Sequence, residues 1–361
     1  MTGVALQVDR IAKRFGRLDA LSDVSFDVAD GELTVLLGAA GAGKTTTLRT
    51  IAGLEVPDRG RVFVKGRDVT HLEPKDRNLA MIFDNLALYP NKTGFANIAH
   101  PLQVQKLAAT TIEQRVTAVA ATLRISHVLN RLPATMSGGE RQRVALGRAL
   151  VRDPDLFLLD EPLSSLDAML RIELRSELKR MQRDHGYAFL LATPDYVEAL
   201  AIADRVVMLV GGQVRQIAPP QVLYDDPVDR EVARFVGAPE INLIAADYDP
   251  SDGGRIRIAD AVMPLPVAQR ERLGGASRSF QAGLRPEHVR LSDGGGAAAR
   301  VSDIEALGLQ SIVTFDASGA VLRAVVPSAE GRRLQIGDRV GLTFSLERMI
   351  GFEERTGSRV A

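Results

Sequence analysis

The sequence predicts an α/β domain with a parallel sheet, followed by a smaller all-β domain. In the first part, short apolar runs alternate with amphipathic helical stretches. These runs cover residues 33–38, 155–161, 187–193 and 205–210. Continuous apolar strands separated by helices are typical of a parallel sheet covered on both faces. The last third instead shows short alternating strands and glycine-containing turns, which predict a small barrel-like domain. Its strands are expected within residues 253–260, 311–327 and 337–347.

Changes in the hydrophobic pattern along the chain suggest where the domains divide. We place the α/β domain at residues 1–236 and the β domain at 237–361. Within the α/β domain, we expect a helical subdomain at about 86–150. Its residues 111–125 repeat apolar positions at helical intervals. The glycine-rich stretch 292–302 is expected to be a flexible connection inside the β domain.

Composition excludes several classes of protein. The chain has 361 residues, with 45 Lys plus Arg against 45 Asp plus Glu. It therefore has no net positive charge that would attract nucleic acid. It has no cysteine, which excludes disulfides and thiolate metal sites. The N-terminus carries charges where a signal peptide is apolar, and no apolar run approaches the roughly 18 residues of a membrane helix. We therefore expect a cytoplasmic chain with no nucleic-acid partner.

The segment "LLGAAGAGKTTTL", residues 36–48, matches the spacing G-x-x-x-x-G-K-[ST] between an apolar strand and a helix. Glycines let backbone N–H groups turn toward phosphate oxygens, and the helix N-terminus adds positive potential. Lys44 then reaches the outer phosphates, and the Thr45 hydroxyl binds Mg²⁺. The alternative is a glycine-rich turn that ends in Lys-Thr by chance, and the strand before it and the helix after it make that interpretation the weaker one. The predicted nucleotide-binding residues here are Gly38, Gly41, Gly43, Lys44, Thr45 and Thr46.

The apolar strand "LFLLDE", residues 156–161, ends in two carboxylates. Asp160 at the carboxyl end of a buried strand can hold Mg²⁺ near the phosphate loop through water. Glu161 is placed to accept a proton from an attacking water, so we assign Glu161 and Lys44 as catalytic residues. Solvated acids also occur at strand ends, but the accompanying phosphate loop makes that interpretation the weaker one.

A third motif opens the helix in "MSGGERQRVALGRAL", residues 136–150. Ser137, Gly138 and Gly139 present a hydroxyl and bare backbone N–H groups at the positive end of a helix. This would be a second phosphate-binding surface, and a single chain does not need two. Alone, the same tripeptide is an ordinary helix start.

These three motifs, in this order, resemble the ATPase subunit of ABC transporters. Residues 163–178 are similar to the family's dimer-interface loop and long helix, and residues 234–244 and 282–291 to the linker and C-terminal barrel of the carbohydrate-importer branch. The resemblance implies a P-loop ABC-type domain with a helical subdomain, then an OB-like TOBE-type regulatory domain. It also implies two subunits facing head to tail, each ATP lying between one phosphate loop and the other subunit's Ser-Gly-Gly helix.

The resemblance also supplies expected partners. They are a second ATPase subunit, two transmembrane permease subunits, an extracytoplasmic solute-binding protein and a regulatory protein at the C-terminal domain. The chain would lie at the cytoplasmic face of the plasma membrane and drive uptake of a carbohydrate, a polyol or a glycerol-like solute. Phe15 matches the position at which an aromatic ring stacks on adenine, although core packing is an alternative role.

Two residues depart from the family pattern. Where relatives have Thr-His-Asp after the fourth apolar strand, this chain has Thr193-Pro194-Asp195. The family's histidine donates to the γ-phosphate, and proline cannot. With Thr193 as the expected N-cap, Pro194 would occupy the first helical position, where no N–H is needed. In addition, Asp84 replaces a glutamine that contacts Mg²⁺ and the attacking water, so Asp84 keeps a metal-ligating oxygen but adds charge.

Loss of one preorganised donor costs roughly 10²–10³ in rate. We therefore expect an impaired own site beside a different, complete ATPase subunit, because the Ser137 helix that serves the partner's site is intact. Two alternatives remain open: a homodimer with slow sites that use Glu161 alone, and a nucleotide-gated regulatory subunit that scarcely hydrolyses ATP. A soluble ATPase acting on DNA or ribosomes is disfavoured by the neutral charge.

Overall fold

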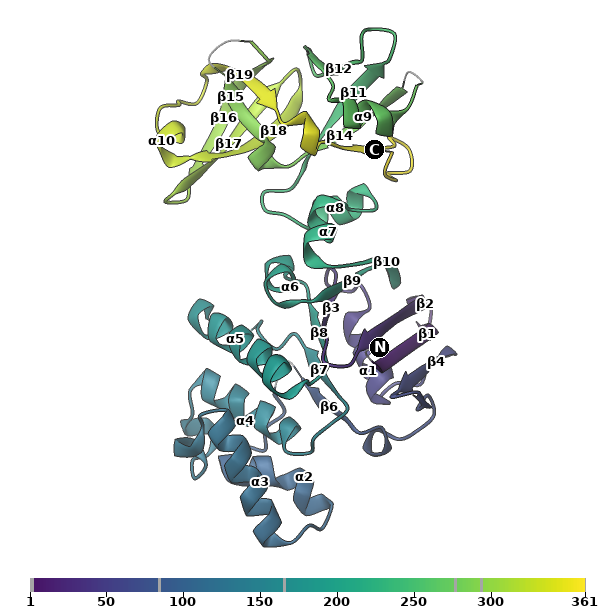
Figure 1. The fold of residues 1–361 in the computed structure, drawn as a ribbon. Helices are drawn as coiled ribbons and strands as arrows, with labels where there is room; N and C mark the ends of the chain where they lie inside the picture. Colours follow the sequence, from purple (N-terminus) through teal and green to yellow (C-terminus); the bar gives the residue numbers. More distant parts are fainter. Residues whose placement is uncertain (1–2, 84–85, 165–166, 276–277, 293–294, 361) are drawn as a thin grey trace. The chain divides into compact units, whose positions relative to one another are not determined.

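The computed structural model describes residues 3–83, 86–164, 167–275, 278–292 and 295–360 (Figure 1). The chain forms two compact units, Met1–Pro220 and Gln221–Ala361. This division comes earlier in the chain than the expected boundary at residues 236 and 237. Each unit has its own sheets and its own hydrophobic core.

A six-stranded sheet forms the centre of the first unit. Its order is β10-β9-β3-β8-β7-β6, and only β10 runs antiparallel to its neighbour. Every residue of β3, β7 and β8 is buried, as a parallel sheet covered on both faces requires. The predicted apolar runs are therefore confirmed as strands. Their bounds are β3 Leu33–Leu37, β6 Leu79–Ile82, β7 Leu156–Asp160, β8 Phe189–Thr193, β9 Arg205–Val210 and β10 Gln213–Ala218.

A second, antiparallel sheet packs against the first with helix α1 (Lys44–Ala52) in the same core. Leu6 of β1, Leu48 of α1 and Leu190 of β8 belong to one buried cluster. The β1–β2 hairpin therefore lies over the sheet that carries the phosphate loop. The strand order is β2-β1-β4-β5, with bounds β1 Val4–Phe15, β2 Leu18–Ala29, β4 Arg59–Val64 and β5 Arg67–Asp68.

The expected helical subdomain is present between β6 and β7 (Figure 1). Helices α2 (Gly94–Val104), α3 (Ala109–Thr122) and α4 (Gly138–Leu150) contact one another, and α4 also contacts β6. Gly147 of α4 permits this packing, because a Cβ there would lie 3.1 Å from Ile98 Cδ1 of α2. Two further helices flank the central sheet, α5 (Ala168–His185) and α6 (Tyr196–Ile202).

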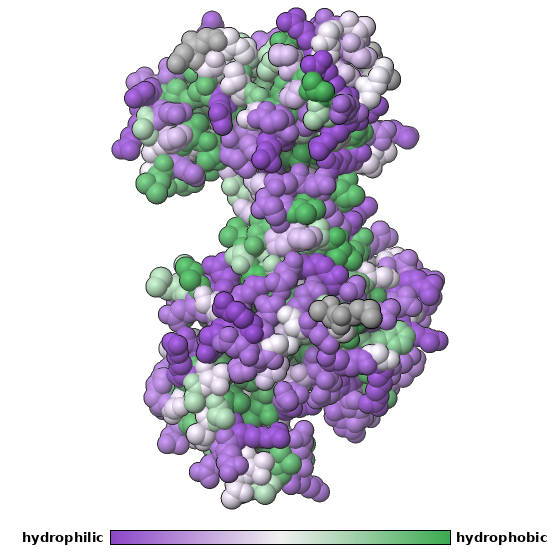
Figure 2. Space-filling view, in the orientation of Figure 1, coloured by the Kyte–Doolittle hydropathy of each residue, from purple (hydrophilic) through white to green (hydrophobic). Residues whose placement is uncertain are grey.

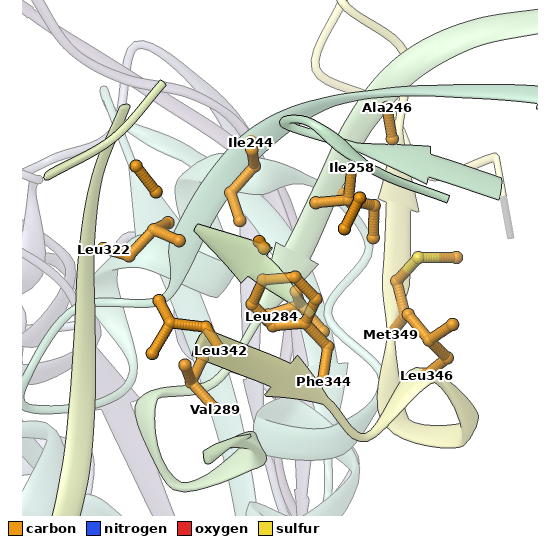
Figure 3. Close-up of a cluster of buried hydrophobic side chains, with 14 of the residues drawn as sticks. Ile244, Ala246, Ile258, Leu284, Val289, Leu322, Leu342, Phe344, Leu346 and Met349 are labelled. Carbon is orange, nitrogen blue, oxygen red and sulfur yellow. The ribbon is translucent and has the colours of Figure 1, made fainter. Parts of the chain in front are cut away.

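The second unit contains two five-stranded antiparallel sheets, which confirms the predicted all-β domain. Their orders are β13-β12-β11-β14-β20 and β15-β19-β16-β17-β18. Inward-facing side chains from both sheets share one core, including Ile244, Leu284, Leu322 and Phe344 (Figure 3). The strands are β11 Asn242–Asp249, β12 Arg255–Ile258, β13 Ala261–Pro264, β14 Arg278–Leu284, β15 Val289–Ser292, β16 Ala297–Ala306, β17 Gln310–Ala317, β18 Ala320–Pro327, β19 Arg339–Phe344 and β20 Ile350–Phe352. Two short helices connect strands of these sheets: α9 (Val267–Leu273) follows β13, and α10 (Ser328–Gly331) follows β18.

The expectation of a flexible connection at 292–302 is wrong for most of that stretch. Residues from Ala297 onward form β16, which pairs with β17 and β19. Ala297, Ala299 and Val301 alternate with exposed residues and are buried in the core. Alternating small side chains suit a crowded interior, so the alanine-rich sequence reflects packing rather than mobility.

Two short helices explain why the units divide before residue 236. Helices α7 (Pro220–Asp225) and α8 (Arg230–Phe235) lie largely or wholly in the second unit. The buried Arg285 guanidinium donates to the carbonyl oxygens of Tyr224, Ala233 and Val236, which end these helices. Helix-terminal carbonyls need partners of this kind, so Arg285, which directly follows β14, holds both helices to the second unit.

Polar and charged residues dominate the face of the molecule drawn in Figure 2, with apolar residues dispersed among them. No helix within the described ranges is long and apolar enough to cross a membrane.

Candidate nucleotide-binding site

The register of the central sheet brings three strand ends together at one edge. Leu37, the last residue of β3, pairs with Thr193, the last residue of β8. Asp160, the last residue of β7, pairs with Ala192 on the other side of β8. The carboxyl edge of a parallel sheet is where open α/β proteins bind ligands. The loops after β3, β7 and β8 therefore form a single candidate site.

Two glycines set the shape of the loop after β3. Gly43 precedes α1 with φ 102°, and a Cβ there would lie 2.8 Å from Ala20 O in the β1–β2 hairpin. At Gly38 a Cβ would lie 2.4 Å from Leu209 O of β9. Any other residue would force the backbone to shift at both positions. This loop therefore has the geometry that the phosphate-binding motif requires, with the N-terminus of α1 at its end.

Lys44 folds back over this loop. Its Nζ donates to the carbonyl oxygens of Gly38 at 2.9 Å and Ala39 at 3.0 Å. It also lies 3.8 Å from Oε1 of Glu161, while only 4% of its side chain is exposed. Burial lowers the pKa of Lys44, and the nearby Glu161 and Asp160 oppose that change. A buried ammonium held by weak neutral acceptors is well placed to bind a phosphate oxygen instead.

The predicted metal ligands Thr45 and Asp160 meet across the site. The Thr45 hydroxyl donates to Oδ1 of Asp160 at 3.1 Å, joining the start of α1 to the end of β7. One hydroxyl and one carboxylate suit Mg²⁺, which keeps several waters and takes further oxygens from phosphates. The donor set therefore fits a magnesium-bound nucleotide. Asp84, the third predicted ligand, lies outside the described residues.

Glu161 has a strained backbone. Its φ is 47°, in the left-handed region that residues with a side chain rarely adopt. Its N–H donates to Ala192 O of β8 at 2.9 Å, which anchors the residue immediately beyond the strand. About a third of the side chain remains exposed, at 32%. Strain of this kind persists where the surrounding structure holds it, and it concentrates at functional sites.

Ser137, Gly138 and Gly139 begin α4 with a complete capping box. The Ser137 hydroxyl accepts from Glu140 N at 3.2 Å, and the Glu140 carboxylate accepts from Ser137 N at 2.7 Å. Glu140 is also bonded to His127 and Arg131. Among the described residues, none of the hydrogen bonds of Ser137 goes to the phosphate loop. The structure thus does not join this surface to the chain's own loop.

Replacing Ser137 by alanine is expected to lower the free energy of unfolding by about 1 kcal/mol, because the N-cap of α4 is lost. The ATP affinity of the chain alone should remain unchanged, since Ser137 does not contact its own phosphate loop. Chemical denaturation and calorimetric titration with Mg-ATP measure the two quantities. A large loss of affinity in the isolated chain would contradict this assignment.

Phe15 lies at the end of β1, where it pairs with Leu18 in the hairpin. Its side chain is exposed to 45%, and Lys13 Nζ lies 5.3 Å from the ring centroid. The same hairpin continues to Ala20, which lies against the Gly43 position. This exposure disfavours a core-packing role. Stacking of the ring on adenine stays a prediction.

The junction between β8 and α6 differs from the expected arrangement. Asp195, not Thr193, is the N-cap of α6: its carboxylate accepts from Val197 N at 2.8 Å and from Glu198 N at 3.3 Å. Pro194 therefore precedes the cap instead of occupying the first helical position, and its ring is exposed. A carboxylate satisfies two helix donors at once, which explains why the helix begins two residues later than expected.

Glu198, also at this junction, was not assigned a role from the sequence. Glu198 is buried, and its Oε2 accepts from the Thr193 hydroxyl at 2.7 Å. The spacing Asp195-x-x-Glu198 is a capping-box pattern and would predict that Glu198 bonds to the backbone N–H of Asp195. Instead that N–H donates to the Thr193 hydroxyl at 3.1 Å. Local pattern alone does not reveal a carboxyl that turns inward.

No histidine directly follows β3, β7 or β8 in the chain. Four of the five belong to the first unit, where they lie in α2, at the C-terminal end of α5, in a single turn and in a loop, and the fifth belongs to the second unit. These residues are His71, His100, His127, His185 and His288. Pro194 itself supplies no imidazole directly after β8.

Comparison with known proteins agrees with this geometry. Residues 21–164 match the family described as ABC transporter, and residues 282–352 match the TOBE domain. The sn-glycerol-3-phosphate import ATP-binding protein UgpC of Chromobacterium violaceum is 41% identical, across 98% of this chain and 96% of that protein. The trehalose/maltose import ATP-binding protein MalK of Thermococcus litoralis is 39% identical across 100% of both chains.

A solved structure shows the same fold for the first unit. It is cbiO1 from Clostridium perfringens, part of the ABC transporter complex cbiONQ, with a TM-score of 0.56 and 25% identity. The match covers 61% of this chain and 90% of that one. With full-length relatives near 40% identity and both family matches in the expected order, the chain belongs to the ATP-binding proteins of ABC transporters, which are ATPases coupled to transport.

Proposed function

We propose that this chain is the ATP-binding subunit of an importer, and that it drives uptake of a carbohydrate, a polyol or a glycerol-phosphate-like solute. Support comes from relatives along the whole chain that are named for import of sn-glycerol-3-phosphate and of trehalose/maltose. The solute would cross through two permease subunits after delivery by an extracytoplasmic binding protein. This chain would attach to those subunits at the cytoplasmic face of the membrane.

In this proposal the phosphate loop binds the triphosphate and Lys44 moves from the carbonyl oxygens of Gly38 and Ala39 to the outer phosphates. Thr45 and Asp160 hold Mg²⁺, which neutralises phosphate charge when bound. Glu161 accepts a proton from the attacking water, and its proximity to Lys44 places it at the phosphate end of the site. Phe15 provides the exposed ring for the base, and Gly41 and Thr46 complete the loop.

The observation that carries the finer proposal is Pro194, directly after β8. This strand lies between β3, which leads into the loop before Lys44, and β7, which ends in Asp160. A donor at this position would stabilise charge that develops on the transferred phosphate. Proline supplies none, so the chain's own site is slow. Asp84 would weaken it further by adding negative charge near the phosphates.

Ser137, Gly138 and Gly139 retain a capped helix N-terminus that can close a partner's site. The chain therefore works beside a different, complete ATPase subunit, giving one fast and one slow composite site. A specific observation also favours the regulatory alternative: the binding residues are intact while the donor is lost. In that case the chain would bind ATP and scarcely hydrolyse it.

Turnover by the purified full-length chain tests the proposal. Alone it should bind Mg-ATP but hydrolyse it about 100-fold more slowly than with a second ATPase subunit encoded by a neighbouring gene. Rapid hydrolysis by the chain alone would contradict an impaired own site. If this chain binds ATP tightly but its own site hydrolyses none even in the full transporter, the regulatory alternative is favoured.

A further inference from the structure

A buried carboxyl group follows Pro194 by one helical turn. Glu198 is exposed to only 8%, and its Oε2 accepts from the Thr193 hydroxyl at 2.7 Å. Its other oxygen, Oε1, is buried and has no hydrogen-bond partner among the described residues. A buried carboxylate with an unsatisfied oxygen lowers the stability of the fold, so its presence calls for a functional explanation.

The surroundings of Glu198 oppose its ionisation. Burial, assisted by the neighbouring Asp195, raises the pKa of Glu198 to about 7 as the net result of all its neighbours. Arg171 and Arg175 of α5 and the hydrogen bond from Thr193 act in the opposite direction. Strands β3 and β8, which also contact α6, bring no charged side chain. A glutamine would keep the hydrogen bond without the cost of a buried charge, so stability does not explain this carboxyl.

Thr193 links Glu198 to the site. Its hydroxyl accepts from Asp195 N–H at 3.1 Å while it donates to Glu198, so one oxygen spans both sides of Pro194. Thr193 also pairs in register with Leu37, directly before Gly38 of the phosphate loop. The backbone at Pro194 has no N–H of its own to hold it in place. Its position therefore depends on the Thr193 hydroxyl and on the group that orients this hydroxyl.

We propose that Glu198 is a positioning residue for ATP hydrolysis: through Thr193 it holds the β8–α6 junction against the phosphate loop, firmly when ionised and loosely when protonated. A carboxylate accepts a shorter and stronger hydrogen bond than a carboxylic acid does. The carboxyl thus makes turnover, rather than ATP binding, sensitive to pH in the neutral range. This inference rests on the proposed hydrolysis at the chain's own site.

The test follows steady-state hydrolysis of Mg-ATP by the full-length chain from pH 6 to pH 8.5, with ATP in excess over protein and with long enough time courses to measure slow rates. The parent rate should fall by up to about tenfold below pH 7, the difference between a charged and a neutral hydrogen bond. Glu198→Gln should remove this step and change the KM for Mg-ATP by less than about twofold. Thr193→Val should lower kcat, with little further loss when combined with Glu198→Gln. Thr193→Ser should preserve the parent profile.

The same series in a Pro194→His background separates the two proposals. If Pro194→His fails to accelerate turnover, the impaired-site proposal is wrong, while the pH step in the parent still reports on Glu198. If Glu198→Gln keeps the parent's pH step, or alters only KM, the positioning role is overturned. Loss of folding does not confuse this result, because the glutamine has the same shape and removes a buried charge.

Discussion

Replacing Pro194 by histidine should accelerate ATP turnover at the chain's own site by about 10²–10³-fold, the usual effect of one preorganised donor to developing charge. Position 194 is exposed and precedes the N-cap of α6, so the substitution leaves the cap of Asp195 and the buried pair Thr193–Glu198 intact. The imidazole would start from the end of β8, between β3, which leads into the loop before Lys44, and β7, which ends in Asp160. Steady-state phosphate release by the full-length chain measures the change.

Pro194→Ala is the matched control. It also removes the ring and restores a backbone N–H, but it supplies no side-chain donor, so it should stay close to the parent rate. Equal rates for Pro194→His and Pro194→Ala would show that the missing imidazole does not limit the site. The affinity for Mg-ATP should be similar in all forms, since the donor acts mainly in the transition state.

Glu198→Gln should make the first unit more stable at pH 8 than the parent, with a smaller gain at lower pH. The folded pKa of about 7 exceeds the ordinary value of 4.5, so between these values the folded chain holds a proton that the unfolded chain releases. The contribution of Glu198 to stability is therefore fully present below pH 4.5 and is lost as the pH rises through 7. At about 1.4 kcal/mol per pH unit, this amounts to on the order of 3 kcal/mol. Scanning calorimetry at pH 5, 6, 7 and 8 measures it.

Glu113→Gln provides a control on an exposed helix of the same unit. It removes the same charge without a buried environment, so its unfolding temperature should track that of the parent across this range. A constant difference between the parent and Glu198→Gln at every pH would show that burial does not perturb this carboxyl. Together with the turnover profile, such a result would also remove the physical basis of the positioning role.

Much of the site was predictable because its chemistry is local. Gly38, Gly43, Lys44 and Thr45 follow one another through the loop after β3 and into α1, so their spacing matches the phosphate-loop motif without any tertiary information. The apolar strands were also predictable, since burial on both faces demands continuous hydrophobic runs. In contrast, the alanine-rich start of β16 resembled a linker, because small residues pack well only against strands that are distant in sequence.

The sequence by itself determined the nucleotide-binding motifs, the order of the α/β and all-β parts, and the absence of a histidine after Thr193. Only the tertiary structure decided that β8 lies between β3 and β7, that Asp195 caps α6, and that Glu198 turns inward to Thr193. The reason is physical: motif spacing is set by neighbouring residues, whereas strand order and the burial of a carboxyl depend on contacts that form when distant segments pack together.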